Sequence, residues 1–160
     1  MLWDFAGVDG LAVAMTLFGQ PVQKLAVWRS LVTPDSNYAI LRLCQGNFRI
    51  RTINNDLDFP RKLAQACSNQ RVWYDQLTYV AEMSCPSDVM LHRLEQIALP
   101  KPPFRLQNLP LNAALPARIN GTAMLIWRYF WQGTDLVQLH CAQGDVQKIR
   151  VCLPDFSTMA

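Results

Sequence analysis

The chain has 160 residues, a formal net charge of +3 and a sequence pI near 8.7, with 51% hydrophobic and 17% charged residues. A chain of this length buries a sufficient core without disulfides or a metal, so residues 1–160 are expected to form a single domain. The mild charge excludes a strongly basic nucleic-acid binder of the kind that composition alone identifies. Because a usual soluble domain has about 25% charged residues, the low charge predicts apolar surface covered by a partner or a second copy.

The five cysteines are odd in number and widely spaced, and no CxxC pair occurs among them. This pattern favours buried thiols over a disulfide framework or a zinc knuckle. No basic residue precedes the first apolar run, and no stretch reaches the roughly 18 apolar residues that a membrane helix needs. We therefore expect a cytoplasmic protein with no membrane span, and neither a metal nor another cofactor is predicted.

The first third of the chain holds an ambiguous stretch followed by a clear hairpin. Residues 11–32 mix helix formers with β-favouring residues; a strand is favoured for 11–18, while the run after Pro21 is open between strand and helix. The sequence TPDSN at 33–37 predicts a turn. Strands are then expected at 38–44 and 48–53, joined at Gln45, Gly46 and Asn47.

A two-residue turn in this hairpin places Arg42, Arg49 and Arg51 on one face. Like charges across a sheet repel, so this cluster predicts a nearby anion, either an external ligand or the chain's own Asp56 and Asp58. A three-residue loop would instead separate Arg42 from the other two arginines. The three arginines are accordingly candidate binding residues.

The middle of the chain predicts two to three helices. Asp58 and Pro60 are typical of a helix start. Helical spacing of Trp73, Leu77 and Val80 favours more helix, although VWY and LTYV leave strand as an alternative. Ser87 is the expected N-cap of a clearer helix whose apolar stripe stops at Pro100, and residues 100–118 are expected to form a proline-rich loop laid over the surface.

The last third, from Gly121 to Leu153, predicts three strands joined by three-residue turns at 132–134 and 143–145. In this register the apolar side chains share one face, which would contain Leu125, Trp127, Tyr129, Val137, Leu139, Cys141, Ile149 and Val151. The opposite face is mixed and cationic. It would carry Arg128, Phe130, His140, Lys148 and Arg150.

Together these elements predict an α+β fold. Antiparallel hairpins or meanders lie at both ends of the chain, with helices between them that pack as a single layer on the sheet. No phosphate loop, GxGxxG turn, GxSxG elbow or HExxH helix is present, so no catalytic residue is assigned.

The favoured function is a non-catalytic protein-protein interaction module: an adaptor, an assembly factor or a subunit of a larger complex, including a self-associating one. Trp127, Tyr129 and Trp131 are candidate interface residues if the sheet is not fully covered. An alternative is a single-stranded nucleic-acid-binding protein that uses the basic outer face of the C-terminal strands. A third hypothesis is an enzyme without a recognisable motif, with His140 or His92 as a candidate catalytic group.

Overall fold

The computed structural model describes residues 1–52, 56–107, 109–153 and 157–158. The chain divides into two compact units, Met1–Leu77 and Thr78–Ala160. Each unit has an antiparallel sheet, helices and a hydrophobic core. The α+β class predicted from the sequence is confirmed, whereas the single domain over 1–160 stays a prediction.

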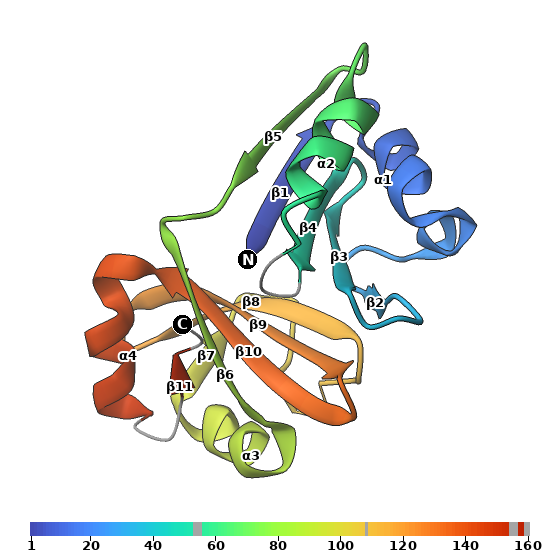
Figure 1. Cartoon of the computed structure of the whole chain (residues 1–160). Helices are drawn as coiled ribbons and strands as arrows, with labels where there is room; N and C mark the ends of the chain where they lie inside the picture. The colour runs from blue at the N-terminus through green and yellow to red at the C-terminus, as the bar shows by residue number, and fades with distance from the viewer. Residues whose placement is uncertain (53–55, 108, 154–156, 159–160) are drawn as a thin grey trace. The chain divides into compact units, whose positions relative to one another are not determined.

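The first unit has a five-stranded sheet in the order β2-β3-β4-β1-β5 (Figure 1). Its strands are β1 (Leu2–Gly7), β2 (Ser30–Val32), β3 (Tyr38–Cys44), β4 (Asn47–Thr52) and β5 (Val72–Gln76). Its helices are α1 (Gly10–Phe18), the 3-10 helix η1 (Gln20–Lys24) and α2 (Phe59–Cys67). Sheet residues such as Phe5 and Phe48, stacked at 5.4 Å, form one core with Val13 of α1 and Leu63 of α2.

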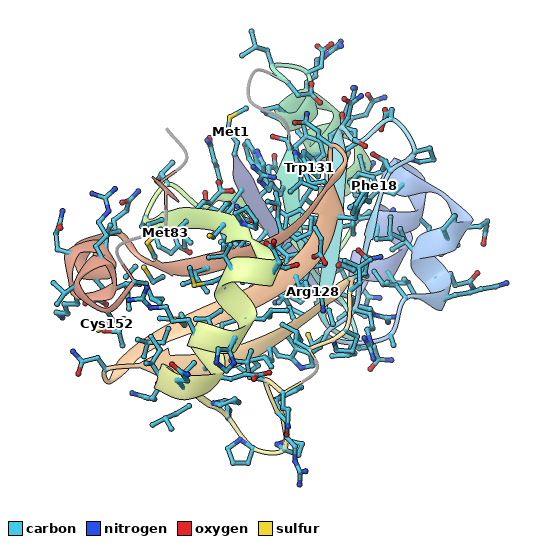
Figure 2. All side chains as sticks on the ribbon, turned by 90° about the horizontal axis from the view of Figure 1, so that it is seen from below. Met1, Phe18, Met83, Arg128, Trp131 and Cys152 are labelled. Carbon is cyan, nitrogen blue, oxygen red and sulfur yellow. The ribbon has the colours of Figure 1, made fainter. Side chains whose placement is uncertain are left out.

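The second unit has a six-stranded sheet in the order β11-β6-β10-β9-β8-β7. Its strands are β6 (Val80–Pro86), β7 (Ala98–Pro100), β8 (Ala113–Ile119), β9 (Thr122–Trp131), β10 (Thr134–Ala142) and β11 (Ser157–Thr158). Its helices are α3 (Ser87–Ile97), the 3-10 helix η2 (Gln143–Asp145) and α4 (Val146–Cys152). Met90 of α3 and Ile149 of α4 share one core with Met83 of β6, which is labelled in Figure 2.

The strand expected at residues 11–18 is wrong, because this stretch is helix α1. Its residues are mostly good helix formers, and Val13 and Ala14 are buried while Leu17 and Phe18 one turn later pack on the same core. Gly10 begins the helix where the backbone of Gly46 comes close: a Cβ at Gly10 would lie 2.1 Å from the Gly46 carbonyl oxygen. The run after Pro21 becomes only the short helix η1.

The helix predicted from Asp58 is confirmed as α2, with Pro60 in its first turn. The cap is different: Oδ1 of Asp56, not of Asp58, accepts the backbone N–H groups of Asp58 and Phe59, both at 3.1 Å. The helix favoured around Trp73 is wrong, and the strand alternative is right: this stretch forms β5 and the start of β6. The aromatic and β-branched residues there pair with β1 and β10.

The β3–β4 hairpin is confirmed, with a turn at Gln45 and Gly46. A β-bulge between Arg42 and Cys44 shifts the register by one residue, so Arg42 lies opposite Phe48 while Arg49 lies opposite Leu41. Successive strand residues point to opposite faces, and Arg42 is therefore separated from Arg49 and Arg51. The guanidinium of Arg42 lies 5.6 Å from the Phe48 ring, on that same face.

The predicted register of β9 and β10 is wrong by one residue. Their turn has two residues, Gln132 and Gly133, both with positive φ (47° and 84°), as a type I′ hairpin requires. Trp127 therefore pairs with Gln138, and Leu125 with His140. Trp127, Tyr129 and Trp131 of β9 consequently share a face with Gln138 and His140 rather than with Val137 and Leu139.

The third strand expected after residue 145 is also wrong, because Val146–Cys152 is helix α4. Ile149 and Leu153 are fully buried and four residues apart, whereas Val151 is 85% exposed. This is helical spacing, not the alternation of a strand. Part of the proline-rich loop predicted at 100–118 is also strand: β8 includes Pro116, whose carbonyl oxygen accepts the Lys101 N–H at 2.9 Å just beyond the end of β7.

Candidate functional site

The five residues predicted to form one cationic sheet face do not lie together. Arg128 of β9 points toward the face that packs on α3 and α4, and His140 of β10 points to the other face. Lys148 and Arg150 belong to helix α4. Phe130 of β9 is 48% exposed. The surface required by the nucleic-acid hypothesis is therefore not formed.

Two of these residues, Arg128 and Lys148, form ion pairs with carboxylates of the same chain. The Arg128 guanidinium donates to both Asp135 carboxylate oxygens, with the shortest contact at 2.7 Å, and to the Leu109 carbonyl oxygen. This hydrogen bonding holds the pKa of Asp135 below its ordinary value. Lys148 Nζ lies 2.6 Å from Oδ1 of Asp145. Arg128 is labelled in Figure 2.

The arginines of the first hairpin also have partners within the chain. Arg42 donates to the backbone carbonyls of Leu25, Cys44 and Gln45. Arg49 forms a two-point pair with Asp4, with both N–O distances at 2.8 Å. Arg51 is buried, at 6% exposure. The counter-ion of Arg49 is therefore Asp4, which lies directly opposite Arg49 on β1, and not the predicted Asp56 or Asp58.

The predicted interface aromatics are buried within this chain: Trp127 and Tyr129 are fully buried, and Trp131 is 5% exposed. The same sheet face holds a buried series of hydrogen bonds between polar side chains. The Tyr129 hydroxyl donates to Oε1 of Gln138 at 2.8 Å, and Nε2 of Gln138 donates to Oε2 of Glu82 at 2.8 Å. His140 lies edge-on to Trp127, with ring centroids 5.9 Å apart. These groups act as structural core.

Exposed aromatic surface lies instead on β5, the edge strand of the first sheet (Figure 1). Trp73 is 57% exposed and Tyr74 is 38% exposed. Trp73 and Asp75 point to one face, and Tyr74 points to the other. In the described ranges no strand pairs with the outer side of β5, so its outward backbone groups have no strand partner.

The charge at this edge is acidic. Asp75 is exposed and lies directly opposite Asp4 of β1, whose carboxylate is already bound by Arg49. At the start of the strand, Arg71 binds the Asp9 carboxylate through Nε at 3.0 Å, and hydrogen bonding from the Arg71 side chain lowers the pKa of Asp9. The strand β5 itself contains Asp75 and no basic residue. We call Trp73, Tyr74, Asp75 and Gln76 the β5 edge.

Comparisons with known proteins identify a shared fold. No family model matches the chain, and no curated protein matches it. Glycine cleavage system aminomethyltransferase T from Bartonella henselae matches with a TM-score of 0.69 and 14% identity, over 96% of this chain. Heterotetrameric sarcosine oxidase from Corynebacterium sp. U-96, solved with pyrrole 2-carboxylate, matches with a TM-score of 0.71 and 18% identity over the same share.

The two matches differ in how much of the other chain they include. This chain spans 43% of the aminomethyltransferase chain, less than half its length, and 77% of the sarcosine oxidase chain. At these identities the likeness shows the fold alone. Among the helices described here, none is long and apolar enough to cross a membrane.

The β5 edge was missed from the sequence because Trp73, Leu77 and Val80 have helical spacing. The run VWY could have indicated this strand, because its residues are β-favouring. The residues that follow it, DQ, are too polar for a central strand and so indicate an edge strand.

Proposed function

We propose that this chain is a non-catalytic subunit of a larger hetero-oligomeric complex and that it binds a partner chain at the β5 edge. The observation that carries the proposal is the exposure of Trp73 and Tyr74 on an edge strand whose outer side pairs with no described strand. Aromatic residues of this kind dominate binding energy in protein interfaces, and an open edge accepts an additional strand through main-chain hydrogen bonds.

The fold comparison supports a subunit role. The chain corresponds to 77% of one chain of a heterotetrameric enzyme, a better match in length than the 43% of the aminomethyltransferase. The low share of charged residues, 17%, also supports surface that a partner covers. All five cysteines are free thiols, which suits the reducing cytoplasm that we propose as its compartment.

The partner segment that fits is an extended strand of a different protein with a lysine or arginine opposite Asp75. A second copy of this chain fits less well, because it would bring another Asp75 to the same acidic edge and β5 has no basic residue to offset it. Opposite charges across neighbouring strands stabilise the pairing, by about 0.2–1 kcal/mol per pair.

The test is affinity purification of the tagged chain from its native host, followed by mass measurement of the intact complex. The wild-type chain should bring a different protein with it in fixed stoichiometry. Trp73→Ser should lose this partner. Leu57→Ser is the matched control, because Leu57 is also an exposed apolar residue of the first unit, at 85%, but lies outside β5. A strictly monomeric chain, or equal capture by the wild type and Trp73→Ser, would overturn the proposal.

A further inference from the structure

A separate cavity of about 450 Å³, widely open to solvent, lies in the second unit, at the C-terminal end of α3 beside β7 and the loop that follows it. Apolar groups provide part of its lining: Ala98, Pro100, Phe104 and Leu106. Ala98 and Leu106 are buried, at 7% and 4% exposure, so they belong to the packed core beneath the cavity. The remaining lining residues are polar: Glu95, Arg105 and Gln107.

These three polar side chains are exposed and carry a carboxylate, a guanidinium and a carboxamide. Other charged groups described above, such as Arg49, Arg71 and Arg128, are bound to carboxylates. In contrast, within the part of the chain that the structure describes, no hydrogen bond or ion pair engages the side chain of Glu95, Arg105 or Gln107. The cavity therefore combines an apolar lining with two opposite charges that do not neutralise each other by direct contact.

The position of Glu95 strengthens the negative end of the cavity. It lies in the last turn of α3, which ends at Ile97, and that turn contains no basic residue. The last carbonyl groups of a helix carry partial negative charge, which favours a cation and disfavours a carboxylate nearby. Glu95, with the field of the nearby helix end, thus provides a cation-attracting group in the cavity lining, and Arg105 provides an anion-attracting group.

We propose that this cavity binds the zwitterion of an amino acid with a short apolar side chain. The ammonium group binds at Glu95 and the end of α3, and the carboxylate binds at Arg105, whose planar guanidinium suits two-point carboxylate binding. The apolar side chain contacts Phe104 and Leu106. The cavity volume lies within the range of about 300–1,000 Å³ typical of small-molecule sites.

The test uses three probes of similar shape on the full chain, measured by calorimetric or NMR titration: leucine, 4-methylpentanoate, which lacks the ammonium group, and 3-methylbutylamine, which lacks the carboxylate. Leucine should bind saturably. Each of the other probes should bind about tenfold more weakly, because each loses one charge-assisted contact.

Two variants test which residue binds the ammonium group of the ligand and which binds its carboxylate. Glu95→Gln should weaken leucine binding about tenfold and leave 4-methylpentanoate binding unchanged, and Arg105→Gln should weaken leucine binding similarly and leave 3-methylbutylamine binding unchanged. The matched controls are Asp88→Asn at the other end of α3 and Lys101→Gln in the same loop, which change the net charge equally outside the cavity. Absence of saturable leucine binding, or equal leucine binding by Glu95→Gln, Arg105→Gln and the controls, would overturn the proposal. Its outcome is independent of partner docking, since Trp73→Ser should bind leucine like the wild type.

Discussion

The backbone N–H of Leu77 donates a hydrogen bond to the carbonyl oxygen of Leu2 at 3.0 Å, and this contact fixes which amides of β5 face outward. In an antiparallel strand, alternate N–H groups point to the same side. The amides of Trp73 and Asp75 therefore point toward β1, and those of Tyr74 and Gln76 point away from it. The proposed docking edge has its own outward donors as well as exposed aromatic rings.

A proline substitution should distinguish the two sets of amides. Tyr74→Pro removes an outward N–H, so it should block partner binding while lowering the free energy of unfolding by no more than about 1 kcal/mol beyond Tyr74→Ala. Asp75→Pro removes a hydrogen bond to β1 and should cost about 2 kcal/mol or more. Urea denaturation of the three variants measures this difference. Equal destabilisation by the two prolines would contradict the assigned direction of the amides.

The Arg128–Asp135 pair predicts a pH-dependent contribution to stability. Hydrogen bonding from Arg128, and further from Ser87, lowers the folded-state pKa of Asp135 below its ordinary value of 3.8. A lowered pKa stabilises the fold at pH values above the ordinary value, and this contribution is lost as the pH falls through the folded-state pKa.

Asp135→Asn should therefore destabilise the protein by about 1 kcal/mol near pH 7, a modest figure because the pair is partly exposed. The difference between the wild type and the variant should shrink below about pH 4. Denaturant unfolding from pH 3 to pH 7 checks this. A difference that grows on acidification would show that the sign is wrong.

Two glycines with opposite surroundings predict opposite effects of a methyl group. A Cβ at Gly10 would lie 2.1 Å from the Gly46 carbonyl oxygen, a backbone atom, so Gly10→Ala should destabilise the protein by about 1–3 kcal/mol. A Cβ at Gly144 would have no atom within 4 Å, and Gly144→Ala should be neutral or stabilising by up to about 1 kcal/mol. Thermal unfolding compares them directly. If both variants unfold alike, the close approach of α1 to the Gly46 turn is not as described.

The buried hydrogen bonds that join Tyr129, Gln138 and Glu82 predict that a substitution of Gln138 strongly lowers the free energy of unfolding. Gln138 has no exposed surface. Gln138→Ala removes the acceptor of the Tyr129 hydroxyl and the donor to Glu82, and it leaves a cavity. The expected loss is about 2–4 kcal/mol of unfolding free energy. The conservative change Tyr129→Phe should cost less, about 1 kcal/mol, because it removes one hydroxyl and retains the ring. Calorimetric unfolding of both variants provides the measurement, and equal losses would contradict this ranking.

The sequence predicts a helix or a strand correctly where a turn or cap residue and the spacing of the apolar residues indicate the same element. The turn at 33–37, the β3–β4 hairpin, α2 after Asp58 and a helix at Ser87 are all present, although Ser87 is the first residue of α3 and not its N-cap. Each combines a turn or cap residue with a clear apolar pattern. Where the apolar residues fit two periods the prediction is wrong, as for Ile149 and Val151, which alternate like a strand but belong to helix α4.

Two differences of a single residue in strand register separate the residues of the predicted arginine cluster and of the predicted cationic face. The bulge between Arg42 and Cys44 and the two-residue turn at Gln132 and Gly133 each reverse the faces of a strand. Neither is marked by an unusual residue, since QG suits turns of several lengths. The predicted arginine cluster and the predicted cationic face both depend on these registers, so neither forms; the cationic face is also lost because Lys148 and Arg150 belong to helix α4.

Hydrogen exchange at the Tyr74 and Gln76 amides tests the docking proposal most directly. In the isolated chain no described strand pairs with these amides and they should exchange rapidly, while those of Trp73 and Asp75, bonded toward β1, should exchange slowly. In the complex purified from the native host, addition of a partner strand should protect Tyr74 and Gln76 strongly. A stable complex in which these two amides exchange as fast as in the isolated chain would contradict docking at the β5 edge.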